Sequence, residues 1–184
     1  QILAYTDSDL SGSSAFLEVD TVSGDVRFNK GMEQIMAGGD TPNLPSLENA
    51  PNAAMQHLIA LGWLPENIGE LTFDSASGIN LSSVDAATGY SVDYEKFVTV
   101  YYGRKIAGLD VFGASRIVVR LGENSELLSV IKRWTDAVPQ AITSNGVYSG
   151  AAMKGRLANT LKGNHSLASG VSVKGATLVM FDDG

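Results

Sequence analysis

The chain has 184 residues, of which 44% are hydrophobic and 18% are charged, and it contains no cysteine. This apolar content excludes a wholly disordered chain, and the lack of cysteine excludes disulfide frameworks, thiolate zinc sites and cysteine nucleophiles. The formal net charge of −7 argues against a nucleic-acid partner, which would require a basic surface. No window approaches the run of about 18 apolar residues that a spanning helix needs, so we expect no membrane span within the chain.

The N-terminal part of the chain reads as strands. Residues 15–20 and 25–29 alternate apolar and polar side chains on either side of a Ser23-Gly24 turn, which predicts a hairpin. Residues 1–37 are therefore interpreted as an N-terminal β-hairpin segment. The Gly- and Pro-rich residues that follow, 38–45, are typical of a linker.

A helix is predicted after this linker. Pro51 suits the first turn of a helix, where its missing N–H leaves no hydrogen bond unmade, and Gly62 suits a left-handed stop at the end. Apolar residues recur at helical spacing between them, which predicts one buried face made of Ala54, Met55, Leu58, Ile59 and Leu61.

Four strands are predicted downstream of the helix, in residues 70–74, 94–102, 115–121 and 126–134. The Ser- and Gly-rich residues between the first two, 75–89, are interpreted as a loop. Short turns join the last three strands, which predicts an antiparallel meander because sequential strands usually pair. The fold class expected is α+β, with a curled antiparallel sheet packed on a helix.

Between the second and third of these strands lies a short glycine-bounded segment. Gly108 and Gly113 flank Leu109, Val111 and Phe112, which alternate as in a strand. Glycine tolerates positive φ, so this pattern predicts a short strand bent at both ends, which lets a sheet curl around a helix.

The C-terminal part, 136–184, is predicted to add a second, smaller unit made of a helix and a strand. Met153, Leu157 and Leu161 recur at helical spacing, and Gly163 follows them as a stop. Residues 171–181 have the composition of a strand.

Several stretches between residues 52 and 134 carry a resemblance to a known family: Leu61-Gly62-Trp63-Leu64-Pro65, Thr99-Val100-Tyr101-Tyr102-Gly103, Gly108-Leu109-Asp110-Val111-Phe112-Gly113, Ile117-Val118-Val119-Arg120-Leu121-Gly122-Glu123-Asn124 and Leu127-Leu128-Ser129-Val130. Together they resemble the FTP and PepSY families, the prosegments of thermolysin-like metallopeptidases. The resemblance implies a cystatin-like FTP/PepSY-type unit over 46–135 and a partial PepSY-like unit over 136–184. Residues 104–107 lie inside the motif where the family is usually shorter, and no metallopeptidase follows within these 184 residues.

The resemblance also implies what the protein does. Prosegments of this type are non-catalytic and contact their peptidase, assisting its folding and blocking its cleft. We therefore expect an exported protein-interaction module, either a prosegment-like inhibitor or folding assistant of a peptidase or an envelope regulator. Gln1, rather than methionine, opens the chain, and a removed secretory signal would explain this start. The expected location is thus secreted or in the cell envelope.

Motifs that would indicate catalysis are missing from the sequence. The only histidines are His57 and His165, and neither has a carboxylate or a second histidine at metal-ligand spacing. Neither a Gly-x-Ser-x-Gly nucleophile elbow nor a Gly-x-x-x-x-Gly-Lys phosphate loop occurs. We therefore expect a protein that is not an enzyme and that needs no cofactor.

One segment near the N-terminus has the spacing of a calcium loop. Oxygen donors stand at its first, third, fifth and twelfth positions, with Gly12 at the sixth, so the candidate ligands for Ca²⁺ are Asp7, Asp9, Ser11 and Glu18. The flanking residues read as strands, whereas an EF-hand needs helices. The pattern therefore favours a solvated acidic loop between two strands.

Charge is unevenly spread along the chain. Residues 104–133 hold six basic and three acidic residues, within an otherwise acidic protein. This basic meander either docks an acidic partner or pairs with acidic neighbours inside the fold, and the second interpretation is favoured because such charges commonly lie on the solvated face of a sheet. The candidate partner-binding residues are Arg104, Lys105, Gly108, Leu109, Val111, Phe112, Arg116 and Arg120.

Two alternatives to a protein partner stay open. The sheet could cup a small ligand, in a pocket lined by Phe97, Tyr101 and Trp134, or the chain could be a structural module of the cell surface. A cleft with convergent polar groups would favour the ligand. An exposed apolar strip along an edge strand would favour the partner, since an open sheet has two edges that can accept a partner's strand.

Overall fold

The structure is a computed structural model, and it describes residues 1–7, 15–31, 42–84, 86–135, 151–152, 155–156, 159 and 180–182. The chain divides into two compact units, one of Gln1–Asp136 with Phe181–Gly184 and one of Ala137–Met180. In the second unit, residues 151–152, 155–156 and 159 are helical. The rest of the predicted C-terminal helix and most of the predicted strand 171–181 lie outside the described residues.

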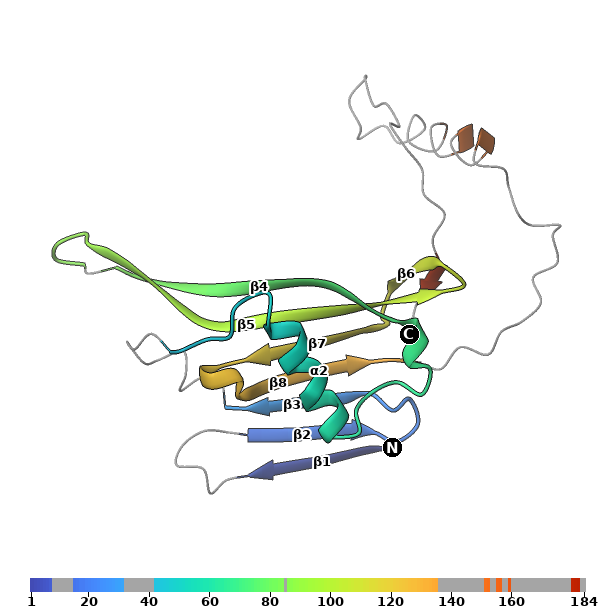
Figure 1. Cartoon of the computed structure of the whole chain (residues 1–184), viewed down its shortest axis with the longest axis horizontal. Helices are drawn as coiled ribbons and strands as arrows, with labels where there is room; N and C mark the ends of the chain where they lie inside the picture. The colour runs from blue at the N-terminus through green and yellow to red at the C-terminus, as the bar shows by residue number, and fades with distance from the viewer. Residues whose placement is uncertain are drawn as a thin grey trace. The chain divides into compact units, whose positions relative to one another are not determined.

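The first unit is built on one large sheet, drawn in Figure 1. Along the sheet the strands follow the order β1-β2-β3-β8-β7-β5-β6-β9, and β4 pairs with the other edge of β5. Every pairing among β1 to β8 is antiparallel. The strands are β1 (Ile2–Asp7), β2 (Ala15–Asp20), β3 (Val26–Lys30), β4 (Leu71–Val84), β5 (Ser91–Ile106), β6 (Leu109–Gly113), β7 (Arg116–Leu121), β8 (Leu127–Arg133) and β9 (Met180–Asp182).

The predicted N-terminal hairpin is confirmed as β2 and β3, with Gly24 at φ +73° in the turn between them. It does not stand apart as a segment of its own, because β3 pairs with β8 and so joins the hairpin to the meander. Sequence periodicity cannot show this pairing, since the two strands lie about a hundred residues apart. The broad α+β class is confirmed.

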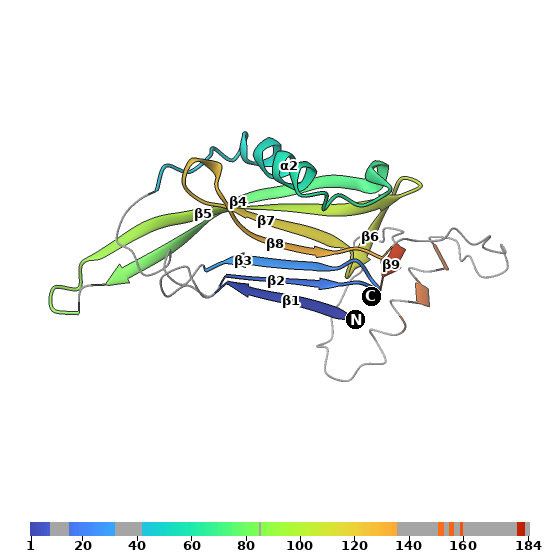
Figure 2. The same cartoon turned by 90° about the horizontal axis from the view of Figure 1, so that it is seen from below.

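Among the described residues of the first unit, one α-helix, α2 (Ala50–Ala60), packs on one face of the sheet (Figure 2). Its residues Ala50, Ala54 and Leu58 have no exposed surface and lie at i, i+4 and i+8, so they form one line along the helix. This line packs against alternate residues of the central strands: Val98, Val100 and Tyr102 of β5, Ile117, Val119 and Leu121 of β7, and Val130 of β8.

The two ends of the helix are held by specific contacts. At its start, the Tyr102 hydroxyl donates a 2.6 Å hydrogen bond to the carbonyl oxygen of Pro51. After its end, Gly62 adopts φ +66°, which confirms the predicted left-handed stop. His57 Nε2 lies 2.8 Å from the carbonyl oxygen of Ser125, so the helix is also tied to the turn between β7 and β8.

The predicted buried face of the helix is wrong at its C-terminal end. Ile59 is 58% exposed and Leu61 is 45% exposed, although both are apolar and at helical spacing. The line through Ala54 and Leu58 faces the sheet. Ile59 follows Leu58 by one residue, which turns its side chain by about 100° around the helix axis and away from this line.

The predicted loop 75–89 is also wrong, because most of it is strand. β4 continues to Val84 and pairs with β5 along its whole length, with register shifts after Phe73 and after Ile79. β7 pairs with β5 only from Val98 to Tyr102. The outer parts of β4 and β5 therefore extend beyond the sheet as a two-stranded arm, which Figure 1 shows plainly.

Candidate functional site: the β5–β6 hairpin, its cleft and the sheet edges

The hairpin between β5 and β6 carries most of the candidate partner-binding residues. Ile106 pairs with Leu109, and Ala107 and Gly108 form the two-residue turn between them, with φ of +50° and +81°. Positive φ at both turn positions matches the twist of the flanking strands. Gly113, at φ +124°, ends β6. The predicted short strand with a bend at each end is therefore confirmed.

Arg104 lies at the base of this hairpin and is buried, with 3% of its side chain exposed. Its Nε and Nη2 donate to Glu70 Oε2 at 2.8 and 2.7 Å, and its Nη1 donates to Ser115 Oγ at 3.1 Å and to the carbonyl oxygen of Thr135 at 2.6 Å. The guanidinium also lies 4.8 Å from the ring centroid of Trp134. These contacts use all three guanidinium nitrogens.

Arg104 therefore holds the fold together and is not placed to touch a partner, which corrects its assignment from sequence. The four residues that contact it come from three places in the chain: the 3-10 turn Ile68–Glu70 (η1), the residue before β7, and the two residues after β8. A buried guanidinium is tolerable only when its donors are all paired. Sequence analysis missed Glu70 because nothing in its local pattern shows that it faces a strand about 30 residues away.

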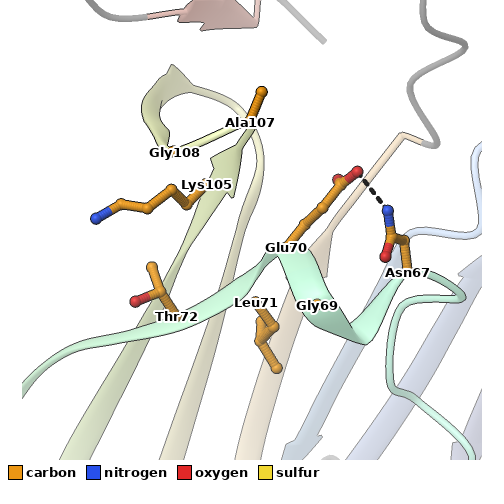
Figure 3. A pocket seen from close by; sticks show the side chains of 8 residues that line it. All are labelled: Asn67, Gly69, Glu70, Leu71, Thr72, Lys105, Ala107 and Gly108. Atoms are coloured by element: carbon orange, nitrogen blue, oxygen red, sulfur yellow. Dashed lines mark hydrogen bonds between the residues drawn. The ribbon is translucent and has the colours of Figure 1, made fainter.

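A cleft opens between η1 and the hairpin turn (Figure 3). It has a volume of about 450 Å³ and is lined by Asn67, Gly69, Glu70, Leu71, Thr72, Lys105, Ala107 and Gly108. Its charged groups already have partners, since Glu70 binds Arg104 and accepts a 2.6 Å hydrogen bond from Asn67 Nδ2, while Lys105 Nζ lies 3.1 Å from Asp110 Oδ1. Ligand pockets are lined mainly by apolar and aromatic side chains, and no aromatic residue lines this one.

The other candidate partner-binding residues are spread over two environments. Lys105, Gly108, Phe112 and Arg116 are exposed, whereas Leu109, Val111 and Arg120 are half-buried. The Phe112 side chain is 58% exposed. The guanidinium of Arg120 lies 5.7 Å from the ring centroid of Phe97.

The three aromatic residues proposed as a ligand pocket do not meet. Trp134 belongs to the core beneath the helix. Phe97 and Tyr101 alternate along β5 with the core residues Val98 and Val100, so they project from the opposite face of the sheet. The alternation was readable from the sequence, but the side of the sheet to which Trp134 belongs was not.

The candidate calcium ligands are only partly described. Asp9 and Ser11 lie outside the described residues, Asp7 ends β1 and Glu18 lies in β2. Glu18 pairs in register with Ala4, three positions from Asp7, and its carboxylate forms an ion pair with Arg27 at 3.0 Å. Among the residues that the structure describes, no group of three or more His, Asp or Glu side chains is placed to hold a metal ion.

The N-terminal edge strand carries three large apolar side chains that are exposed. In β1, Ile2 is 67% exposed, Leu3 is 55% exposed and Tyr5 is 67% exposed. β1 pairs with β2 on one side, and in the described part of the chain no strand pairs with its other side. β4 is likewise unpaired on its outer side within that part.

The backbone of β1 is arranged to accept another strand. The amide of Thr21 donates to the carbonyl oxygen of Gln1 at 2.9 Å, and hydrogen-bonded pairs recur at every second residue of an antiparallel ladder. The alternate residues therefore turn their N–H and C=O groups away from β2, toward the open side: Ile2, Ala4 and Thr6. Sequence analysis identified these residues as strand-like but could not show that they form an edge.

Comparisons of the chain with family models, with curated proteins and with solved structures gave no match. Within the described residues, no helix combines the length and apolar character needed to cross a membrane. The functional proposal therefore rests on the sequence and the structure of this chain.

Proposed function

We propose that the chain is a protein-interaction module that binds a partner by adding the partner's strand to the open side of β1. The observation that carries this proposal is the exposed apolar strip of Ile2, Leu3 and Tyr5 on an unpaired edge strand. Exposed, unpaired edges are normally protected by charges, prolines or a covering segment, because they invite pairing. β1 has neither lysine nor proline.

Strand addition would provide partners for both the outward backbone groups and the exposed side chains of β1. The outward N–H and C=O groups of Ile2, Ala4 and Thr6 provide the main-chain hydrogen bonds, which give affinity. Leu3 and Tyr5 share one face of the strand, and their side chains provide cross-strand contacts, each worth about 0.2–1 kcal/mol.

The resemblance to FTP and PepSY prosegments supports a more specific form of the proposal. The partner is then a peptidase, which this exported module inhibits or helps to fold, or another protein of the cell envelope. A sheet with one face covered by a helix and two edges open is consistent with such a role. The small-ligand alternative is not proposed, because Phe97, Tyr101 and Trp134 do not line one pocket.

The test uses a proline in the edge strand. In Ala4→Pro, the lost N–H is one that points away from β2, so the β1–β2 ladder keeps its hydrogen bonds while an added strand loses one. Ala4→Ser keeps the N–H and serves as the matched control. The secreted fraction of the source is passed over immobilised wild type and both variants, and captured proteins are identified and assayed for peptidase activity.

The expected result is a protein retained by the wild type and by Ala4→Ser but not by Ala4→Pro. In the purified complex, hydrogen exchange at the amides of Ile2, Ala4 and Thr6 should slow, because those amides become bonded to the added strand. Recovery of a bound small molecule and of no protein partner would overturn the proposal, as would equal capture by all three proteins.

A further inference from the structure

Two arginines stand directly opposite each other on neighbouring strands. Arg116 of β7 pairs in register with Arg133 of β8, and both side chains are exposed. Residues directly opposite in an antiparallel pair have Cβ atoms about 5 Å apart, and like charges at such positions are destabilising. The sheet therefore concentrates two positive charges at one point of its surface.

Four other cations among the described residues are paired with carboxylates. Arg104 is paired with Glu70, Lys105 with Asp110, Arg27 with Glu18 and Lys30 with Glu126. Among the described residues, no carboxylate lies within ion-pair distance of Arg116 or Arg133. The expectation that the basic meander pairs internally therefore holds for Arg104 and Lys105 but not for these two.

Among the described acidic residues, the one nearest to the arginine pair in the strand register already has a hydrogen-bond partner. Asp25 directly precedes β3, whose first residue Val26 pairs with Lys132, so Asp25 is next to Arg133 in the same register. Its Oδ1 accepts a 3.0 Å hydrogen bond from the backbone N–H of Trp134. The Asp25 carboxylate is thus committed to the end of β8, and no carboxylate of the described residues compensates the arginine pair.

On the β5 side of the pair, the nearest position in the β5–β7 register is a glycine. Arg116 precedes Ile117, which pairs with Tyr102, so the next position of β5 toward Arg116 is Gly103. Gly103 has no side chain, and a methyl group there would meet only the Thr72 side chain, at 3.9 Å. Thr72 is opposite Gly103 on β4 and lines the cleft of Figure 3. Gly103 therefore adds no side chain between Arg116 and Thr72.

We propose that Arg116 and Arg133 form a binding site for carboxylate groups carried by acidic side chains of the partner protein. Guanidinium groups bind carboxylates through two parallel hydrogen bonds, and a charged donor with a charged acceptor makes one of the stronger hydrogen bonds in proteins. An acidic segment bound here removes the repulsion between the two arginines. This site deepens the proposed function and rests on it, because the carboxylates are taken to belong to the protein that binds at β1.

The test measures binding of an oligoglutamate peptide by calorimetry at low salt, with an oligoglutamine peptide of equal length as the uncharged probe. The wild type should bind oligoglutamate and not oligoglutamine, and added salt should weaken the binding. Arg116→Gln and Arg133→Gln should each weaken it by up to about fivefold, the usual contribution of an exposed ion pair. Arg27→Gln is the matched control, because Arg27 is an exposed arginine that already has a carboxylate partner.

Three outcomes would overturn the inference. The first is an equal loss of binding in Arg27→Gln, which would indicate attraction by overall charge. The second is unchanged binding in the double variant Arg116→Gln/Arg133→Gln. The third is tighter binding of inorganic phosphate than of oligoglutamate at the same arginines, which would make this a site for a free ion. Folding of each variant is checked by urea unfolding, and removing one arginine should raise the midpoint at low salt.

Failure here and failure of the proposed function are distinguishable. If strand addition at β1 is wrong, Ala4→Pro captures the partner as well as the wild type does, whatever the arginines bind. If the arginine site is wrong, Ala4→Pro still loses the partner, whereas the double arginine variant retains it with the affinity of the wild type.

Discussion

The ion pair between Glu70 and Arg104 offers the sharpest test of how this fold is held together. It joins η1 to β5, and through the guanidinium it reaches Ser115 before β7 and Thr135 after β8. The side chains are 3% exposed for Arg104 and 15% exposed for Glu70. Substituting Glu70→Gln keeps the shape of the side chain but removes its charge, which leaves a buried guanidinium without its counter-ion.

Removing one partner of a buried pair typically costs 3–5 kcal/mol, because the remaining charge stays desolvated. Glutamine retains one acceptor oxygen for the Arg104 N–H groups, so we expect a loss at the lower end, about 3 kcal/mol in the free energy of unfolding. For a chain of this size that corresponds to a fall of about 6–12 °C in Tm.

The assay is urea unfolding at 25 °C, followed by tryptophan fluorescence, since Trp134 lies against the Arg104 guanidinium. The matched control is Glu126→Gln, which removes the partner of Lys30 in an ion pair whose side chains are 42% and 49% exposed. Such an exposed pair should be worth less than about 1 kcal/mol. If Glu70→Gln costs no more than Glu126→Gln, then water screens the Glu70–Arg104 pair and the argument from burial is refuted.

Two further substitutions test the helix and its contact with the sheet. Leu58→Ala should cost about 2–5 kcal/mol in the free energy of unfolding because Leu58 has no exposed surface, whereas Ile59→Ala should change it by less than about 0.5 kcal/mol; equal losses would contradict the orientation of α2. Tyr102→Phe removes the hydrogen bond to Pro51 and should cost about 1 kcal/mol. Burial raises the pKa of Tyr102 to about 12, above its unfolded value of about 10. The unfolded chain therefore loses this proton first, so urea melts of the wild type should show a loss of stability as pH rises from about 10 to 12, and Tyr102→Phe should reduce that loss.

Local sequence signals identified those parts of the fold that neighbouring residues decide. The Ser23-Gly24 turn, the stop at Gly62 and the short strand between Gly108 and Gly113 all depend on residues that tolerate positive φ, and glycine marks such positions in any sequence. These features were predicted correctly because the cause and the signal lie in the same few residues.

The candidate site was predicted less well, because its properties arise from pairing between distant strands. Arg104 and Arg116 look alike in the sequence, yet one is buried against Glu70 and the other stands exposed opposite Arg133. The Ser- and Gly-rich part of β4 has weak strand propensity, and it becomes a strand because β5 offers it a complete ladder of partners.

The amino-acid sequence by itself determined the β2–β3 hairpin, the helix and the two glycine bends, since each follows from backbone preferences within a few residues. Only the tertiary structure decided which strand became an edge, which arginine was buried and which side chains share a face. These depend on strand order and register, which are set by contacts between residues far apart in the chain and leave no local pattern.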